Sequence, residues 1–325
     1  MTTAPSAAES GTRTGDRHEQ IRALVRHGID GRGDHHGPRV LERLAEGQQG
    51  GPYTCFTVHP CGPLIGAEIE GLDLAEPLTP EVFDELDRAL LEWKVLFFRR
   101  QELTHEQQRA FAAHWGEIDQ HPFLPKGASQ DVVRLEKGSN NPGFENVWHH
   151  DFPWIPNPPL GAVLRMVEMP GAGGDTLFAD TAAAYDNLPD HLKARLEGLR
   201  AVHDFTPSAN YRDLLTDEQR RHFQELFPPV AHPVVRTHPR TGRKSLFVTS
   251  IFTTHIEGLA EAESEELLGE LFRQVQYPEY QVRFRWQPGD VVFWDNRAVQ
   301  HYATSDYYPH RRVVDRAAIA GSRPF

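Results

Sequence analysis

Two histidines and an aspartate stand side by side in the segment 146–154, "NVWHHDFPW". If this segment enters or leaves a strand, residues two apart point to the same face, so His149 and Asp151 converge while His150 points away. An imidazole and a carboxylate on one face supply two ligands of a two-histidine, one-carboxylate site, which leaves positions on Fe(II) open for a bidentate cosubstrate and dioxygen. A histidine beside an aspartate is also common on protein surfaces, so the pair alone leaves both interpretations open.

A third ligand and an anion-binding group have candidates near the end of the sequence. The segment 291–316 runs from an apolar strand through a polar turn to His301 and then to a strand with Arg312 and Arg316. Residues two apart on a strand share a face, so both arginines point the same way. A guanidinium binds a carboxylate through two parallel hydrogen bonds, which suits a dianionic cosubstrate. Pairing of these arginines with acidic side chains is the alternative that the residues leave open.

The elements that must position these residues are many short strands and a few helices. One helix is predicted with Thr79 as N-cap and an apolar face that ends at Trp93, and a second opens with the capping box of Thr104 and Gln107. Further helical patterns cover 181–199, 216–226 and 261–275. Strands are expected at 53–60, 64–74, 94–99, 131–135, 161–168, 175–180, 200–205, 233–238, 245–249, 281–286, 291–296 and 311–319. This pattern predicts a mainly β fold with flanking helices, a jelly roll or barrel rather than a doubly wound sheet.

Composition narrows the class of protein. The chain has 325 residues, of which 39% are hydrophobic and 25% charged, and a formal net charge of −12. A basic surface is needed to bind nucleic acid or an anionic membrane, so neither is expected as a partner. Cys55 and Cys61 are too few for a disulfide framework, and no apolar signal or membrane segment is present, so a cytoplasmic protein is expected. We expect a poorly ordered or loosely docked extension over 1–51 and one domain over 52–325.

Two longer segments carry a resemblance to a known family. These are "WHHDFPWIPNPPLGAVLRMVEMPGAGGDTLFADTAAAYDNL" and "WDNRAVQHYATSDYYPHRRVVDRAAIAG". Together with "GPLIGAEIEGLDL" and "RFRWQPGDVVFWDN", they make the chain resemble the TauD/TfdA, taurine dioxygenase-like family of Fe(II)/2-oxoglutarate-dependent dioxygenases from about residue 54 onward. The resemblance implies a double-stranded β-helix, a cupin-like jelly roll with iron at its mouth.

The resemblance also implies roles for particular residues. His149, Asp151 and His301 would be the iron ligands, while Arg312 and Thr176 would hold the distal carboxylate of 2-oxoglutarate. The implied reaction uses dioxygen to oxidise a substrate C–H bond, most simply by hydroxylation, and releases succinate and CO2. Because an aspartate is kept among the ligands, the halogenating variants of the family are not expected.

The substrate is expected to be a small to medium anion other than taurine. By resemblance, Arg316 and His121 would hold its anionic end, and Phe152 would line the mouth unless it belongs to the core. Glu145 replaces an amide of the taurine enzymes and would meet an amine or hydroxyl group. Leu124 and Ala209 replace pocket aromatics. A larger pocket follows, suited to an amino acid derivative or a sulfate or phosphate ester of specialised metabolism.

The sequence is also compatible with two other functions. The same iron site would also support desaturation, cyclisation or oxidative cleavage, because the outcome depends on how the substrate lies. A jelly roll that binds a metal and a small anion without catalysis is the more distant alternative. By analogy with the family, the protein would form a dimer or tetramer.

Overall fold

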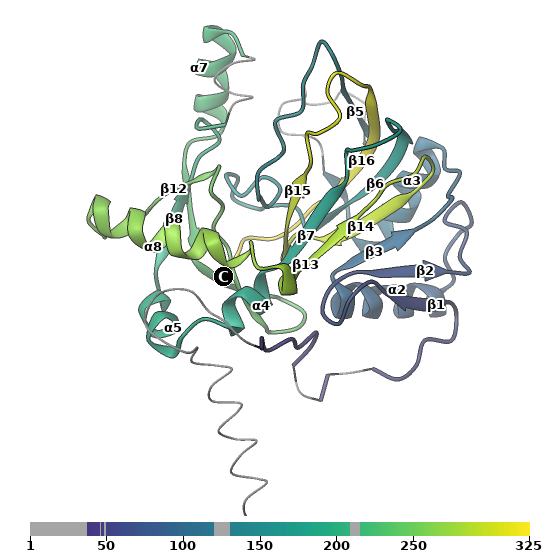
Figure 1. Cartoon of the computed structure of the whole chain (residues 1–325), viewed down its shortest axis with the longest axis horizontal. Coiled ribbons are helices and arrows are strands. Elements are labelled where there is room, and N and C mark those ends of the chain that lie inside the picture. The colour runs from purple at the N-terminus through teal and green to yellow at the C-terminus, as the bar shows by residue number, and fades with distance from the viewer. Residues whose placement is uncertain (1–37, 46, 49, 120–130, 209–214) are drawn as a thin grey trace, which may run out of the picture.

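The large β-sheet contains strands from both halves of the chain (Figure 1). The computed structural model describes residues 38–119, 131–208 and 215–325, apart from positions 46 and 49. The strands of the large sheet are β1 (Thr57–Pro60), β2 (Ala67–Glu70), β3 (Val95–Phe98), β4 (Ile118–Asp119), β5 (Val133–Lys137), β6 (Gly161–Glu168), β14 (Val291–Asp295) and β16 (Arg312–Ile319). Their order in space is β1-β2-β3-β14-β6-β16-β4, and β5 also pairs with β16. Except for the parallel pair β2 and β3, these pairings are antiparallel.

Smaller sheets complete the β structure. One has the order β13-β7-β15, a second β12-β8-β9, and a third pairs β10 with β11. Their strands are β7 (Thr176–Asp180), β8 (Arg200–His203), β9 (Val230–Pro233), β10 (Val235–Thr237), β11 (Lys244–Leu246), β12 (Thr253–Ile256), β13 (Gln281–Phe284) and β15 (Val299–Ala303). A mainly β fold with flanking helices is therefore confirmed.

Strand β14 shows how the two halves of the core are separated. All five of its residues are buried. Val292 and Trp294 belong to the apolar cluster shared with β7, β13 and β15, whereas Val291 and Phe293 belong to the cluster under the helices. Because successive side chains point to opposite faces, one strand serves both cores. The first cluster fills the jelly roll, whose open end holds the candidate site.

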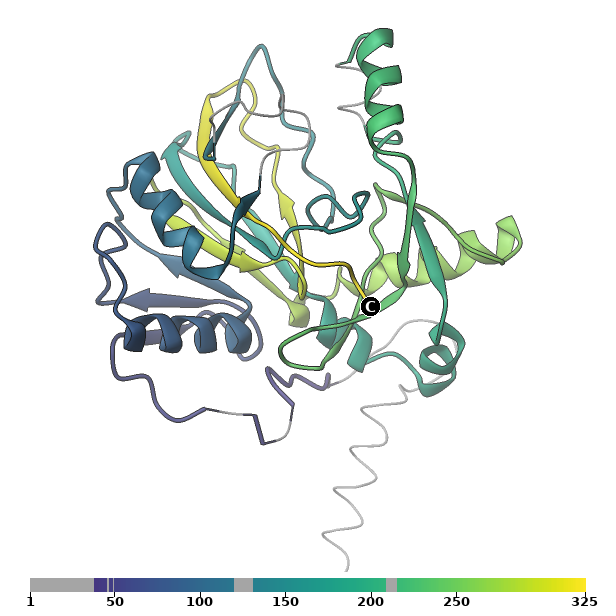
Figure 2. The same ribbon diagram turned by 180° about the vertical axis from the view of Figure 1, so that it is seen from behind.

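Helices cover the outer face of the large sheet and extend the β12-β8-β9 side (Figure 2). The helices are α2 (Pro80–Trp93), α3 (His105–Ala112), α4 (Thr181–Asp186), α5 (Asp190–Leu196), α7 (Asp217–Leu226) and α8 (Glu261–Gln274), with short 3-10 turns η1 (Ala113–Trp115) and η2 (Pro278–Tyr280). The Thr79 hydroxyl accepts from the Val82 amide at the start of α2, and the predicted capping box opens α3. Both helix starts are confirmed.

Two predicted elements differ from the structure. The helical pattern over 181–199 is two helices, α4 and α5, because Asn187 ends the first and Pro189 precedes the second. The polar turn expected before His301 is shorter than predicted, since His301 lies inside β15 and pairs with Phe178 of β7. A polar strand beside a metal site lacks the apolar alternation that identifies a strand in a sequence.

Part of the predicted N-terminal extension packs on the body of the protein. Val40 donates its amide hydrogen to Asn187 Oδ1 at 2.8 Å, and Leu44 is buried. Residues 1–37 lie outside the described part, so the expected boundary at residue 52 stays a prediction. In the described residues, none of the helices is both long and apolar enough to cross a membrane. Cys55 and Cys61 are free thiols, as predicted.

Candidate active site

His149, Asp151 and His301 converge at the open end of the jelly roll. One ligand atom from each lies within 4.8 Å of the others. The two histidines are joined through their backbones, since the His149 amide donates to the His301 carbonyl at 3.1 Å and the His301 amide donates back at 2.9 Å. This isolated bridge fixes the loop that carries His149 and Asp151 against β15.

The protonation states of these side chains suit metal binding. His149 Nδ1 lies 2.7 Å from the Val147 carbonyl oxygen. A carbonyl only accepts, so Nδ1 carries the hydrogen and the lone pair of Nε2 is left for a metal. Burial lowers the pKa of His301 well below its usual value, which keeps this ring neutral. Burial raises the pKa of Asp151, but the neighbouring Arg316 guanidinium outweighs it, and the pKa falls to about 2.

Asn296 holds the loop that carries Asp151. Its side-chain oxygen accepts from the Asp151 amide at 2.8 Å, and its side-chain nitrogen donates to the carbonyls of Asp151 and Pro159, both at 3.1 Å. His150 points away from the site and is fully buried, with its ring nitrogens 3.1 Å from the Asn296 carbonyl and 3.4 Å from the Leu246 carbonyl. The strand alternation predicted this difference between His150 and its neighbours.

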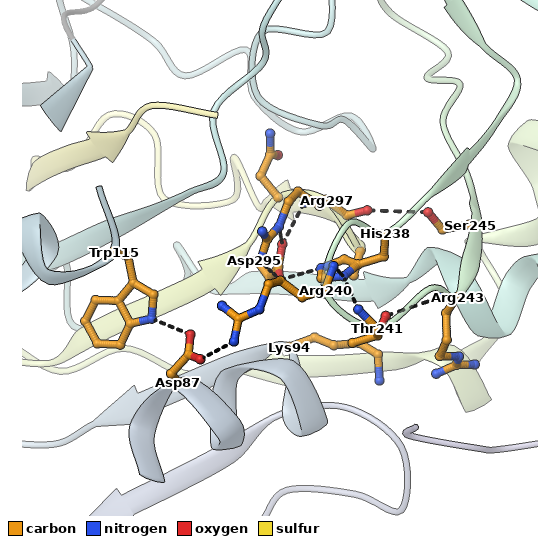
Figure 3. Close-up of polar contacts among 12 residues, drawn as sticks. Asp87, Lys94, Trp115, His238, Arg240, Thr241, Arg243, Ser245, Asp295 and Arg297 are labelled. Atoms are coloured by element: carbon orange, nitrogen blue, oxygen red, sulfur yellow. Dashed lines mark hydrogen bonds and ion pairs between the residues drawn. The ribbon is translucent and has the colours of Figure 1, made fainter. Parts of the chain in front are cut away.

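A buried polar network holds the turn that precedes β15 (Figure 3). The Asp295 carboxylate pairs with Arg297 at 2.7 Å and with His238 at 3.0 Å. Its backbone amide donates to the carbonyl of Lys94 at 2.9 Å, and the neighbouring Arg240 pairs with Asp87 of α2 at 2.7 Å. The loop 238–245, the end of α2 and the turn of Asp295 are thereby fixed to one another. Asp295 and Asn296 thus shape the turn that places His301.

Thr176 and Arg312 lie on adjoining walls of the same cavity. Thr176 begins β7 and Arg312 begins β16, and both are more than 90% buried. Arg312 donates from Nε to the Gly174 carbonyl at 3.2 Å. Among the described residues, neither of its terminal nitrogens has a hydrogen-bond partner. Because Arg312 lines the cavity, its guanidinium is available as a two-pronged donor for a carboxylate.

Arg316 faces the cavity two strand positions beyond Val314. Its Nη2 lies 2.9 Å from Asp151 Oδ2, and its guanidinium carbon lies 5.2 Å from the centre of the Phe152 ring. Arg312, Val314 and Arg316 all line the cavity, as the strand alternation predicts. One of the two arginines is therefore already paired with an acid of the site, the alternative that the sequence had left open.

Of the remaining residues predicted to bind substrate, some line the cavity and others lie outside the described residues. Phe152 and Glu145 line the cavity, whereas His121 lies outside the described residues, as do Leu124 and Ala209. Glu145 is already paired, because its Oε1 lies 2.7 Å from the ammonium nitrogen of Lys137. The carboxylate thus already has one cationic partner, and its role toward an amine of the substrate stays a prediction.

The cavity has a volume of about 430 Å³, and both polar and apolar side chains line it. The polar part of the lining includes the three converging side chains with Thr176, Arg312 and Arg316. The apolar part of the lining includes Phe144, Phe152, Trp154, Phe205, Ile251 and Phe252. Several of these aromatic residues form a small cluster of their own with Phe223 and Phe227 of the α7 region. Such a cavity suits a molecule with one anionic end and one apolar end.

Several residues that line or support the cavity were not identified from the sequence. Lys137 shares a strand face with Leu135, so the alternation of β5 was a usable signal. Trp286 contacts Thr176, and Phe205 and Phe252 belong to the apolar part of the lining. Their places depend on strand register and loop packing, for which the sequence offers no local signal.

A jelly roll with this set of side chains defines the class of 2-oxoglutarate-dependent oxygenases. The chain belongs to the taurine catabolism dioxygenase TauD, TfdA family, whose model matches residues 57–318. It is a 2-oxoglutarate-dependent dioxygenase, as the resemblance implied. Iron and dioxygen are implied by this family.

Relatives with known activities cover most of the chain. An alkylsulfatase of Acinetobacter baylyi is 39% identical over 79% of this chain and 82% of its own length. An α-ketoglutarate-dependent sulfate ester dioxygenase of Pseudomonas putida is 37% identical over 82% and 90%. An α-ketoglutarate-dependent 2,4-dichlorophenoxyacetate dioxygenase of Cupriavidus pinatubonensis is 38% identical over 80% and 96%.

Solved structures agree with this assignment. A taurine dioxygenase from Burkholderia xenovorans has a TM-score of 0.71 with 37% identity, over 83% of this chain and 93% of the other. AAD-2 in complex with Mn(II) and N-oxalylglycine has a TM-score of 0.71 with 31% identity, over 83% and 99%.

Proposed function

We propose that this dioxygenase uses Fe(II), 2-oxoglutarate and O2 to oxidise a C–H bond of a monoanionic organic molecule, with an alkyl sulfate ester as the favoured substrate class. The carrying observation is the convergence of His149, Asp151 and His301 in one cavity with Arg312 and Arg316. A cavity that bound an anion without catalysis would not need two guanidinium groups beside a metal triad.

The three side chains fit Fe(II). Two neutral imidazoles and one carboxylate are the ligand set that non-haem Fe(II) oxygenases use. His301 Nδ1 is buried without a hydrogen bond from the described residues, so the polypeptide leaves a polar atom of this site unsatisfied. When bound, iron supplies the activation of O2 for C–H oxidation.

The cosubstrate and the substrate are held by different cations. Arg312 and the Thr176 hydroxyl bind the distal carboxylate of 2-oxoglutarate, since both border the cavity beside the triad. Arg316 stands next to Asp151 and faces the substrate anion. The apolar wall orients the alkyl or aryl part and keeps water away from the oxidised carbon.

The charges around the cavity favour a monoanion. Among the described lining residues, Lys137, Arg312 and Arg316 are cationic, and Glu145 and Asp151 are anionic. The two positive charges of Fe(II) and the two negative charges of 2-oxoglutarate cancel, which leaves a net charge of one positive unit. A sulfate ester, sulfonate or carboxylate neutralises it, whereas a phosphate monoester dianion would leave an unpaired charge in a desolvated site.

A sulfate ester has an anionic end and an apolar chain, which match the cationic and the apolar side chains that line the cavity. Hydroxylation at the carbon that bears the ester oxygen yields a geminal hydroxy sulfate, which separates into an aldehyde, sulfate and a proton. One O2 is consumed, one oxygen atom enters succinate as CO2 leaves, and the other enters the substrate. Similarity to an alkylsulfatase and a sulfate ester dioxygenase supports this class, and similarity to a phenoxyacetate dioxygenase makes aryloxyacetates the second candidates.

The cofactor assignment is tested by anaerobic titration of the purified protein with Fe(II) and 2-oxoglutarate. We expect a weak visible charge-transfer band only when both are present, and a loss of the band in Arg312→Ala. Arg311→Ala is the matched control, because Arg311 is exposed and pairs with Glu136 and Glu168 outside the cavity. No band with metal bound would overturn the assignment.

The substrate class is tested with three compounds that share one octyl chain and with two compounds of other classes. Octyl sulfate, octanesulfonate, octyl phosphate, a phenoxyacetate and taurine are incubated with Fe(II), 2-oxoglutarate and O2, and succinate and released oxyanion are measured. We expect the sulfate ester to give the highest kcat/KM and equal amounts of succinate and sulfate. Succinate without sulfate would indicate oxidation at another carbon, such as desaturation, and a preference for taurine would contradict the proposal.

A further inference from the structure

The indole of Trp286 reaches the hydroxyl of Thr176 from outside the cavity. Trp286 Nε1 lies 2.9 Å from Thr176 Oγ1, and both side chains are 4% exposed. Trp286 does not line the cavity, whereas Thr176 does. The indole is therefore placed behind the hydroxyl and away from any bound molecule.

Strand register creates this contact. Phe284, the last residue of β13, pairs with Thr176, the first residue of β7, and Trp286 follows two positions later. The Trp286 ring packs edge to face on Phe284, with ring centres 5.0 Å apart. It also lies 6.0 Å from the guanidinium carbon of Arg312. One rigid side chain thus contacts both groups that are proposed to hold 2-oxoglutarate.

The chemistry of the two groups fixes the direction of the hydrogen bond. An indole N–H only donates, so Thr176 Oγ1 must accept from it. The hydroxyl hydrogen then has to point elsewhere, and in the described part of the chain Thr176 Oγ1 has no other hydrogen-bond partner. The open direction is the cavity that Thr176 lines. Without the indole N–H, the hydroxyl would be free to turn and accept from a neighbouring donor instead.

We propose that Trp286 is a positioning residue that turns the Thr176 hydroxyl into a fixed donor to the distal carboxylate of 2-oxoglutarate. The inference rests on the proposed assignment of Thr176 and Arg312 to that carboxylate. Preorganised donors bind more tightly than groups that must first reorient, so the benefit is expressed in affinity for the cosubstrate.

The test compares two cosubstrate analogues on the Fe(II)-loaded protein without oxygen. 2-Oxovalerate has a methyl group where 2-oxoglutarate has the distal carboxylate, so it chelates iron but cannot bond to Thr176. In Trp286→Phe we expect the dissociation constant of 2-oxoglutarate to rise about 3- to 10-fold, the effect typical of one lost hydrogen bond. The dissociation constant of 2-oxovalerate stays unchanged. Equal weakening of both acids would show a general packing role and overturn the proposal.

A double-mutant cycle separates positioning from direct contact. In the Thr176→Val background, Trp286→Phe should have no further effect on 2-oxoglutarate binding, because the hydroxyl that it orients is gone. Additive effects would overturn the proposal. Trp93→Phe is the matched control, since Trp93 Nε1 is buried without a hydrogen-bond partner among the described residues, and binding should not change.

A second variant and a measurement on the unaltered protein complete the test. If Trp286→Phe does not fold, 3-benzothienylalanine at position 286 replaces the N–H by sulfur while keeping the bicyclic shape, and the same selective loss is expected. If the unaltered protein loaded with Fe(II) forms no complex with 2-oxoglutarate, the proposed function fails together with this inference. If it does bind and Trp286→Phe binds equally well, only this inference is overturned.

Discussion

Arg316 Nη2 and Asp151 Oδ2 are 2.9 Å apart, so the cation proposed for the substrate also contacts the carboxylate proposed for iron. The other carboxylate oxygen, Oδ1, lies 3.7 Å from His301 Nε2. The two oxygens of Asp151 therefore face different partners. If Asp151 holds iron as proposed, Arg316 would leave Oδ1 as the oxygen available to the metal.

Loss of this pair should weaken metal binding. In Arg316→Met, Asp151 loses the charge that orients it, and we expect the affinity for Fe(II) to fall about 10- to 100-fold, as is typical for groups that support a ligand. Affinity is measured anaerobically by competition with a chelator. Arg134→Met is the control, because Arg134 pairs with Asp315 away from the cavity. Wild-type affinity in Arg316→Met would show that Arg316 serves only the substrate.

Removal of the Glu145 charge should strengthen binding of anions. Glu145→Gln leaves Lys137 without its ionic partner, so KM for the sulfate ester should fall by up to about fivefold, which corresponds to about 1 kcal/mol for a partly exposed pair. For a phosphate ester with the same alkyl group, KM should fall further. Glu136→Gln, which removes a carboxylate outside the cavity, is the control. Loss of turnover with an amine-bearing substrate alone would instead support the direct role predicted from the sequence.

Asn296 should matter for both stability and metal binding. Asn296→Ala leaves the buried Asp151 amide without its acceptor, so we expect the free energy of unfolding to fall by about 2–4 kcal/mol and Fe(II) to bind more weakly. Asn187→Ala removes a similarly buried amide that bonds Val40 and Ala183. It should lower stability without altering metal affinity. Equal metal affinity in both variants would contradict a positioning role for Asn296.

Two buried histidines should make the fold sensitive to mild acid. Burial lowers the pKa of His203 well below its usual value of 6.5 and the pKa of His232 to about 4, so both are neutral in the folded protein at pH 6. Between about pH 6.5 and 4 the unfolded chain binds more protons, and the free energy of unfolding therefore decreases as the pH falls. Each histidine contributes up to about 1.4 kcal/mol per pH unit.

This sensitivity is measured by urea unfolding between pH 6.5 and 4.5. His232→Gln does not titrate at this position and should give a shallower pH dependence than the unaltered protein. The exposed His255→Gln should leave the slope unchanged. An identical slope in His232→Gln would show that other groups control acid unfolding.

Local sequence patterns predict the helix starts and the buried strands of this fold. The N-cap of α2, the capping box of α3 and the bounds of β6 follow from side-chain chemistry and burial period within a few residues. Strand alternation also separates His150 from the two histidines of the site. The polar strand β15 was not predicted, because its residues serve the cavity rather than a continuous apolar face.

Local sequence patterns do not predict the contacts that support the site. Trp286 meets Thr176 through the register of β13 against β7, and Asn296 meets Asp151 across 145 positions of the chain. Lys137 neutralises Glu145 because a loop folds back on β5. Each of these contacts depends on the packed fold, whereas the identity of the proposed ligands followed from residue type, spacing and family resemblance.

The backbone bridge between His149 and His301 has a consequence for the order of events during folding. The two residues belong to opposite halves of the chain, and β16 with its arginines pairs with β6 on one side and with β4 and β5 on the other. Closing such long loops is entropically costly, and contacts of this kind form late. During synthesis, the first half of the protein would leave the ribosome with two ligands but no complete site. We therefore expect iron acquisition to follow completion of the barrel rather than to nucleate it.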